Sequence, residues 1–469
     1  MKKIINNKKF LLISLFICFS LFLCTFIFKE SDYFWHIKAG EYMTNHGILT
    51  KDVFSYSVLG KYWMSHEWLF EVIVYNLKRL FGNYNMIVCL FIFMIIIYYF
   101  FYKYNKDKIY KNLFFSLIWI LLSSIFIFYM QCRPHLCSYI MLSISMYLIY
   151  SLIRNEKSNK IYFLPILTIL WSNLHGGSSN LGYLLCFFVL IIGLFNFKFN
   201  KIEAKRLSKK QIKKILYVGI ISIFCTMINP HGFKMMIYPY TNMLDSTMIT
   251  FIAEWKPTNI NNLSHFPFFI LGIIILLILL FSKKKIRFLD FALFGLGIYL
   301  GLKAIRFWPY LYIISSYYIF DYVEEFKFNN IKYIILFINI LIICLFVRSI
   351  NKINIEVNKE YLYLDEKFIN ILKREKPTKL FNIYDTGGEL IYHSIPVFID
   401  GRADLYSSNG ILNKYLNISG TDKGYEELIK LYDFDYYIVE SGSRLEKYIL
   451  NIGVDKLYSN DKYSLYKIK

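Results

Sequence analysis

Two carboxylates and a histidine follow the first apolar run of the chain. Residues 10–28 are mostly apolar, and Glu30, Asp32 and His36 come directly after them. A carboxylate where a membrane helix meets water can act as a general base or bind a cation on a membrane-bound substrate. Aspartate is also favoured at the start of a helix, so the alternative is a structural cap. This acidic pair makes Asp32 and Glu30 the first candidates for catalysis.

A third carboxylate and a second histidine extend this set. Glu67 lies in the same polar segment, and its alternative is an exposed helix face. His36 and His175 are candidates to hydrogen-bond a substrate. The sequence lacks the spacings H-x-x-x-H and H-E-x-x-H that place two histidine ligands on one helix face. The metal content is therefore unknown, and a divalent cation shared by the carboxylates stays open.

Three cations are candidates to bind a phosphate. Arg133, Lys303 and Arg306 each fall at the predicted end of an apolar run, on the side assigned to Asp32. Arginine binds phosphate with two parallel hydrogen bonds, and lysine acts as a point charge. The alternative is that the long side chains extend from helix ends toward water.

The composition identifies a membrane protein. Of 469 residues, 56% are hydrophobic, and the mean hydropathy is +0.41. The apolar runs are long enough for about eleven membrane spans, since a span needs roughly 20 residues. The predicted spans are 10–28, 84–102, 113–130, 137–153, 161–174, 180–197, 215–229, 266–282, 288–305, 307–320 and 332–348.

The charges predict the orientation. The net charge is +21, and the excess lies mainly in short loops such as 198–214 and 283–287. Because cytoplasmic loops of membrane proteins are enriched in lysine and arginine, we expect the N-terminus inside and the C-terminal region outside. The expected location is the cytoplasmic membrane. Short basic loops that meet anionic lipid explain the charge without a nucleic-acid partner.

The chain divides into two predicted domains. Residues 1–350 form the transmembrane domain, with a large first outside loop at 29–83. Residues 351–469 alternate short apolar runs with amphipathic segments, which predicts a small extracytoplasmic α/β domain. The predicted strands are 380–384, 396–400, 436–439 and 463–468, and the predicted helices are 386–394 and 425–432. The fold class is thus mostly α, with a small α/β domain.

A charged motif after one predicted strand has two interpretations. Asp400, Arg402 and Asp404 alternate in the segment 400–404. They could form a carbohydrate-binding or docking loop. Alternatively, Arg402 pairs with one of the two aspartates and rigidifies the domain, which is the interpretation we favour.

Several motifs, in order along the chain, carry a family resemblance. The motifs are DYFWHIKAG (32–40), DVFSY (52–56), HEWL (66–69), RPH (133–135), WSNLHGG (171–177), NPHG (229–232), EW (254–255) and IDGRADLY (399–406). With these motifs the sequence resembles a widespread group of bacterial multi-pass membrane proteins that look like GT-C glycosyltransferases, and the resemblance covers nearly the whole chain. The segment 30–32 reads Glu-x-Asp, which departs from the D-x-D form of many GT-C enzymes.

The resemblance implies a membrane glycosyltransferase. GT-C enzymes transfer a sugar from a polyprenyl-phosphate donor and place a catalytic acid in the first outside loop, which here implicates Asp32. The expected partners are this donor, membrane lipid and a glycan, lipid or protein acceptor of the cell envelope. A transporter or flippase of lipid-linked sugars is the main alternative, although such proteins usually carry charges at mid-membrane. The second alternative function is that of a non-catalytic envelope assembly protein.

Overall fold

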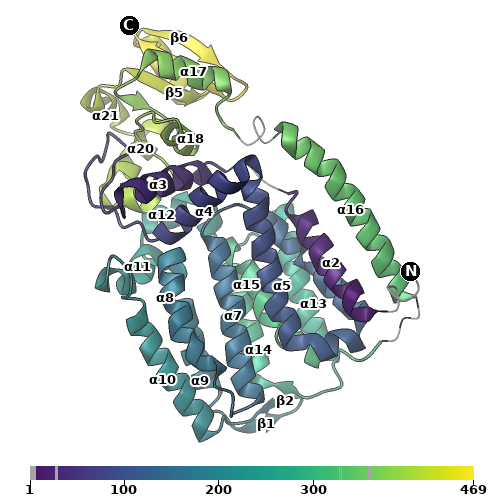
Figure 1. Ribbon diagram of the computed structural model, residues 1–469. Helices are drawn as coiled ribbons and strands as arrows, with labels where there is room; N and C mark the ends of the chain where they lie inside the picture. Colours follow the sequence, from purple (N-terminus) through teal and green to yellow (C-terminus); the bar gives the residue numbers. More distant parts are fainter. Residues whose placement is uncertain (1–6, 27–29, 327, 329, 357–361) are drawn as a thin grey trace. The chain divides into compact units, whose positions relative to one another are not determined.

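The computed structural model describes residues 7–26, 30–326, 328, 330–356 and 362–469 (Figure 1). The chain forms two compact units. Unit 1 comprises Met1–Ile27, Met86–Met243 and Ile252–Lys352, and unit 2 comprises Phe28–Asn85, Leu244–Phe251 and Ile353–Lys469.

Unit 1 is a bundle of helices, most of which run side by side (Figure 1). Every predicted span corresponds to helix in the structure. Its helices are α2 (Lys8–Leu23), α5 (Asn85–Lys111), α6 (Leu113–Leu122), α7 (His135–Arg154), α8 (Leu164–Leu174), α9 (Leu181–Ile192), α10 (Lys209–Cys225), α11 (Phe233–Met243), α13 (Phe266–Phe281), α14 (Phe288–Lys303), α15 (Trp308–Ser315) and α16 (Ile331–Glu356).

Fewer helices meet the length of a membrane span than the sequence analysis predicted. Among the described residues, four helical runs are long and apolar enough to cross a membrane: Trp68–Lys111, His135–Arg154, Leu263–Phe281 and Ile331–Ser349. Other predicted spans are shorter, in part because they combine α-helix with 3-10 helix, as at Leu113–Tyr129. These helices support the predicted membrane character, whereas the count of about eleven stays a prediction.

A small sheet that the sequence did not predict lies at one end of unit 1, below the helices in Figure 1. It consists of β1 (Phe197–Phe199), β2 (Ile202–Ala204) and β3 (Ile286–Arg287), in the order β1-β2-β3. β2 and β3 are parallel and pair Glu203 with Arg287. This sheet joins the two loops whose lysines and arginines predicted the orientation.

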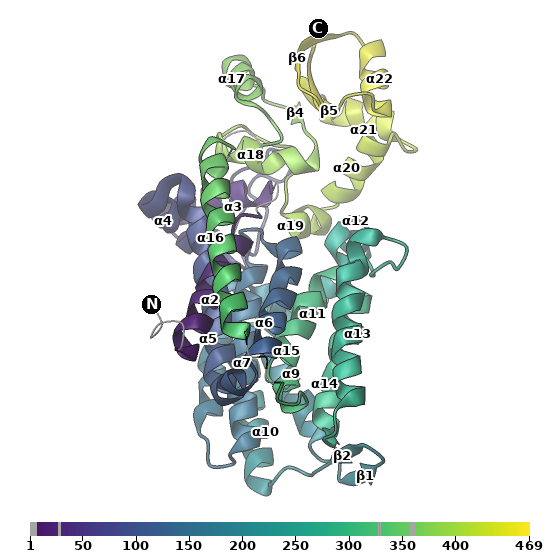
Figure 2. The same cartoon turned by 90° about the vertical axis from the view of Figure 1, so that its right-hand side faces the viewer.

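Unit 2 contains a four-stranded sheet in the order β4-β5-β7-β6, with helices around it (Figure 2). β4 and β5 are parallel, and the other pairs are antiparallel. The C-terminal α/β region is therefore confirmed. The elements of unit 2 are α3 (Asp32–His46), α4 (Trp68–Phe81), α12 (Ser246–Phe251), α17 (Glu366–Glu375), β4 (Leu380–Phe381), α18 (Gly387–Tyr392), α19 (Ala403–Ser408), α20 (Ile411–Gly420), α21 (Tyr425–Tyr432), β5 (Tyr436–Glu440), α22 (Arg444–Asn451), β6 (Val454–Ser459) and β7 (Tyr463–Ile468).

One predicted strand is wrong, and one strand was missed. Residues 396–400 are not a strand of the sheet, because a side chain takes their backbone hydrogen bonds. The amide of Asn382 accepts from the Phe398 N–H and donates to the Ile399 carbonyl, each at 2.8 Å. The missed strand is β6, whose mixed burial pattern gives no clear alternation.

The first polar segment belongs to unit 2. The sequence analysis placed 29–83 with the transmembrane domain, whereas the structure packs Phe28–Asn85 with the C-terminal region. A parallel bridge joins Ser55 to Val397, and the Ser57 hydroxyl donates to the Phe398 carbonyl at 2.5 Å. These contacts cross more than 300 residues of sequence, a distance that local patterns cannot predict.

Candidate functional site

A glycine sets the distance between the helices that carry the acidic residues. A Cβ atom on Gly40 of α3 would lie only 2.1 Å from the carbonyl oxygen of Glu71 on α4. The two helix backbones therefore meet at this point. His36 precedes Gly40 by four residues, which puts both on one face of α3. The close approach thus brings His36 against the first turns of α4.

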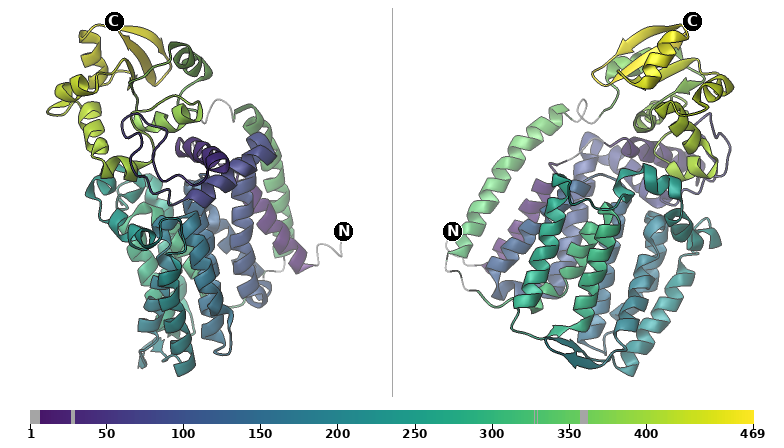
Figure 3. Two further views of the ribbon diagram at one scale, coloured as in Figure 1. Left: turned by 60° about the vertical axis from the view of Figure 1, so that its left-hand side comes forward. Right: turned by 180° about the vertical axis from the view of Figure 1, so that it is seen from behind.

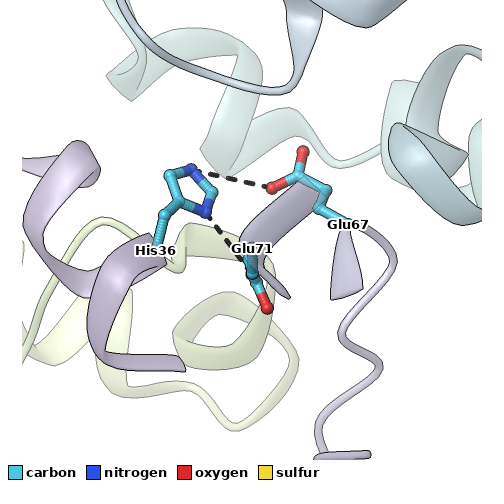
Figure 4. A group of neighbouring side chains, drawn as sticks. All are labelled: His36, Glu67 and Glu71. Carbon is cyan, nitrogen blue, oxygen red and sulfur yellow. Dashed lines mark hydrogen bonds and ion pairs between the residues drawn. The ribbon is translucent and has the colours of Figure 1, made fainter. Parts of the chain in front are cut away.

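His36 lies between two glutamates (Figure 4). Its Nδ1 atom is 3.4 Å from Glu71 and its Nε2 atom 3.9 Å from Glu67. His36 and Glu71 are buried, and the Ser65 hydroxyl donates to Glu71 at 3.0 Å. Burial disfavours a charged carboxylate that has no compensating partner. The His36 ring and the Ser65 hydroxyl are hydrogen-bond partners of Glu71, and a divalent cation bound here would balance its charge.

The geometry of these three side chains fits a metal ion. One donor atom from each of His36, Glu67 and Glu71 lies within 4.8 Å of the others. Imidazole nitrogen with carboxylate oxygen is a donor set used for zinc and other divalent transition metals. These residues would hold the ion, which would supply positive charge next to the polar segment 30–36.

A second histidine connects this cluster to the C-terminal part of unit 2. The His66 ring lies 3.2 Å from Glu67 and 3.8 Å from Asp404. Burial disfavours the charged ring, but Glu67 and Asp404 outweigh it and raise the pKa of His66 to about 9. His66 is therefore positively charged at neutral pH. It neutralises part of the acidic cluster.

Asp32 begins α3 and is buried in unit 2. Its carboxylate accepts a hydrogen bond from the Trp35 indole at 3.0 Å. A Cβ atom on Gly401 would lie 1.7 Å from the same carboxylate oxygen, so only glycine fits there. Glu30 accepts the Asp32 backbone N–H at 3.0 Å. Glu30 thus holds the start of α3, and a negative charge at a helix N-terminus is favourable.

Arg402 forms a fully buried ion-pair network. Its guanidinium donates to Asp400 at 2.6 Å and to Asp52 at 2.5 Å, and all three side chains have no exposed surface. The ring of Trp63 lies 4.7 Å from the guanidinium. The pairing of Arg402 with Asp400 confirms the structural interpretation of the motif at 400–404. The sequence did not predict Asp52 as a partner.

In unit 1, two of the predicted phosphate ligands lie together. Arg133 and Arg306 both pair with Glu254, at 3.5 Å and 3.3 Å. The Trp255 ring lies 4.6 Å from the Arg306 guanidinium. Burial alone would raise the pKa of Glu254, but the two arginines outweigh it and lower the pKa to about 2. In these contacts two guanidinium groups share one carboxylate, and we call this group the arginine pair.

The other two predicted ligands of unit 1 have different surroundings. His175 is buried, and its Nδ1 atom shares a 2.6 Å hydrogen bond with the Ser138 hydroxyl. The Trp171 indole donates to the same hydroxyl at 2.8 Å, so these contacts fix the His175 ring. Lys303 is the last residue of α14 and is exposed, as expected for a side chain that extends toward water.

Two acidic partners in the candidate site were not predicted from the sequence: Glu71, which contacts His36, and Asp404, which contacts His66. Glu67 and Glu71 are four residues apart around the first turn of α4, a spacing that places both on one helix face. Histidine spacings alone do not reveal this pair of glutamates. Asp404 could not have been paired with His66, because more than 300 residues separate them.

The fold has known relatives among solved structures. No family model and no curated protein sequence match the chain. Its structure is similar to the archaeal oligosaccharyltransferase AglB from Archaeoglobus fulgidus, solved with an inhibitory peptide and a dolichol-phosphate, with 12% sequence identity and a TM-score of 0.55. The apo form of an oligosaccharyltransferase from the same organism gives a TM-score of 0.52, also at 12% identity.

Both matches cover 98% of this chain and 74% of the other. AglB has the GT-C fold. At this identity the similarity concerns the fold. It supports the predicted GT-C-like, polytopic membrane architecture.

Proposed function

We propose that the protein transfers a sugar from a polyprenyl-phosphate-linked donor to an acceptor of the cell envelope, at the outer face of the cytoplasmic membrane. The observation that carries the proposal is the arginine pair. Two guanidinium groups, far apart in the sequence, converge on one carboxylate, so that two cations meet one acid in these contacts. The relative with this fold binds a dolichol-phosphate, which is a lipid of the proposed class.

The chemistry assigns a separate role to each group. A carboxylate takes the proton of the acceptor hydroxyl, whose oxygen attacks the anomeric carbon of the sugar. The bond to the phosphate breaks, and the polyprenyl phosphate leaves with the electron pair. Arg133 and Arg306 stabilise the charge that develops on this phosphate. Because hydrogen-bond donors that are already in place need not rearrange during the reaction, they stabilise this charge without an added energetic cost.

Asp32 is the proposed base. It follows the first apolar helix, and the Trp35 indole and the close approach of Gly401 fix the position of its carboxylate. Glu30 is a positioning residue, because it holds the backbone N–H of Asp32. Glu67 is a further candidate carboxylate, and it lies 3.9 Å from His36 and 3.2 Å from His66. His175 and Lys303 stay predicted substrate ligands.

Binding of polyprenyl phosphate tests the phosphate site without knowledge of the sugar. The full chain is placed in nanodiscs, titrated with polyprenyl phosphate and examined by native mass spectrometry. Arg306→Ala should weaken binding at least tenfold, since a hydrogen bond to a charged group contributes about 1.5–3 kcal/mol. Arg348→Ala, at an exposed position of α16, is the matched control and should change affinity less than threefold. Equal affinity of wild type and Arg306→Ala would exclude the arginine pair as the phosphate site.

The proposed orientation has its own test. A reporter enzyme that is active only outside the cytoplasm, fused after Lys469, should be active, because the loop charges place the C-terminal region outside. Activity of a cytoplasmic reporter at the same position would contradict the proposed orientation.

A further inference from the structure

A cavity of about 600 Å³ opens at the end of unit 1 that carries the small sheet. The pairing of β2 with β3 brings two basic loops together there (Figure 3). The first loop contributes Lys205 and Arg206, and the second contributes Lys285 and Arg287. Arg154, the last residue of α7, lines the same cavity. We call this the basic cavity.

The charge in the basic cavity is unbalanced. Five lining side chains are cationic, and the lining acids are Glu156 and Glu203. Glu203 is partly neutralised by Lys285, at 3.8 Å. A neighbouring cavity of about 420 Å³ shares Arg154, Lys285 and Arg287 and adds Lys108 and Lys284. Its lining contains one acid, Asp321, which lies 3.0 Å from Arg287 and 3.8 Å from Arg154. Several cations therefore face one region without an equal number of acids in its lining.

Two of the arginines are held in place by buried partners. The Arg287 Nε–H donates to Asp290 at 2.8 Å, and Asp290 has no exposed surface. The Tyr150 hydroxyl also donates to Asp290, at 2.6 Å. Arg154 lies 3.8 Å from the ring of Tyr104 and donates to its carbonyl. Such fixed guanidinium groups lose little freedom when they bind an anion.

Apolar side chains also line the basic cavity, and they lie near the end of a helix long enough to cross a membrane. Ile192, Leu207, Phe288 and Leu289 line the basic cavity beside the cations. Arg154 ends the apolar helix α7, which begins at His135 and has 20 residues. At 1.5 Å per residue, α7 is about 30 Å long, the thickness of the hydrocarbon core. Arg133 precedes the other end of α7, so the arginine pair and the basic cavity mark its two ends.

We propose that the basic cavity binds an anionic phospholipid of the adjacent leaflet. The cations bind its phosphate, and the apolar side chains contact the upper part of its acyl chains. Basic pockets between membrane helices on the cytoplasmic side are suited to such headgroups. This site is distinct from the arginine pair, and it does not depend on the proposed sugar transfer.

The test uses the full chain in detergent, titrated with phosphatidylglycerol or phosphatidylcholine and examined by native mass spectrometry. Phosphatidylglycerol should bind at least tenfold more tightly. The triple variant Lys205→Gln/Arg206→Gln/Lys285→Gln should weaken its binding roughly 100-fold, at about fivefold for each cation near the phosphate. All three side chains are on the surface, so the variant should fold. Equal affinity for the two lipids would overturn the proposal.

A charge-matched control separates the cavity from general attraction to basic loops. Lys209→Gln/Lys210→Gln/Lys213→Gln removes the same charge from exposed positions of α10 that do not line the basic cavity. It should change the affinity less than threefold, and a loss equal to that of the triple variant would contradict the proposal. Soluble glycerol phosphate should not compete. Competition by glycerol phosphate at equal concentration would show a site for free phosphate. Tighter binding of polyprenyl phosphate than of phosphatidylglycerol would show a substrate site. Either result would overturn the proposal that the basic cavity binds a phospholipid.

Discussion

Each unit contains a cluster of arginine and carboxylate, and the two clusters differ in burial and in charge. In unit 2, Arg402 pairs with Asp52 and Asp400, and none of the three side chains is exposed. In unit 1, Arg133 and Arg306 pair with Glu254, and these side chains are 15–28% exposed. In these contacts one arginine meets two acids in unit 2, and two arginines meet one acid in unit 1.

This difference separates a structural role from a binding role. Arg402 is enclosed by aromatic rings, including Trp63, and its hydrogen bonds connect Asp52 with the segment 400–406. It has no surface that a ligand could reach. The arginine pair combines accessible surface with two cations that share one acid, so an anion can approach it. The same residue types therefore serve stability in one unit and, as proposed, phosphate binding in the other.

The largest expected effect is the loss of Arg402. Arg402→Met should destabilise unit 2 by about 3–5 kcal/mol, because it leaves two carboxylates buried without their cation. The measurement is the free energy of unfolding of the full chain in denaturant, followed by proteolysis at sites in the C-terminal region. Lys379→Gln is the control, because it breaks an exposed pair with Asp433 and should change stability by less than about 1 kcal/mol. Similar stability of the two variants would contradict the structural role.

The second prediction concerns acid stability of the arginine pair. A carboxylate with a lowered pKa stabilises the fold above its ordinary pKa, and this contribution disappears as the pH falls through the lowered value. For Glu254 the window extends from about pH 4.5 down to about pH 2. The melting temperature of wild type should fall more steeply in this window than that of Glu254→Gln. Parallel curves would show that Glu254 is not held by the two arginines.

The third prediction has the opposite sign of pH dependence. A histidine with a raised pKa stabilises the fold below its ordinary pKa, and this contribution is lost as the pH rises through the raised value. For His66 the window runs from about pH 6.5 to about pH 9. His66→Gln should reduce the loss of melting temperature between pH 6 and pH 9.5. His46→Gln, at an exposed position of α3, should leave the profile unchanged.

The sequence predicted the helical regions better than the contacts between them. Apolar runs located the helices of unit 1 except α11, which lies between two predicted spans, and α21 has the predicted bounds. The strand predicted at 396–400 failed because the Asn382 side chain occupies its backbone groups, and periodicity carries no information about that. Helix lengths were overestimated where 3-10 turns interrupt an apolar run.

The candidate site shows the same limit. The sequence identified Arg133 and Arg306 singly, and their shared partner Glu254 was visible only as part of a motif. Glu71 has the i, i+4 spacing to Glu67 that could have indicated it. The pairs His66–Asp404 and Arg402–Asp52 depend on tertiary packing across more than 300 residues. No local pattern specifies such pairs.

Sugar transfer by the purified protein is the most direct test of the central claim. The full chain in liposomes is supplied with a panel of polyprenyl-phosphate monosaccharides carrying a labelled sugar, together with cell-envelope extract as acceptor. We expect labelled acceptor with wild type and a rate reduced roughly 10²–10⁴-fold with Asp32→Asn, which keeps the side-chain shape but cannot accept the proton. Asp32→Asn should still bind polyprenyl phosphate. Equal transfer by wild type and Asp32→Asn, or movement of the intact donor across the bilayer without transfer, would contradict the account.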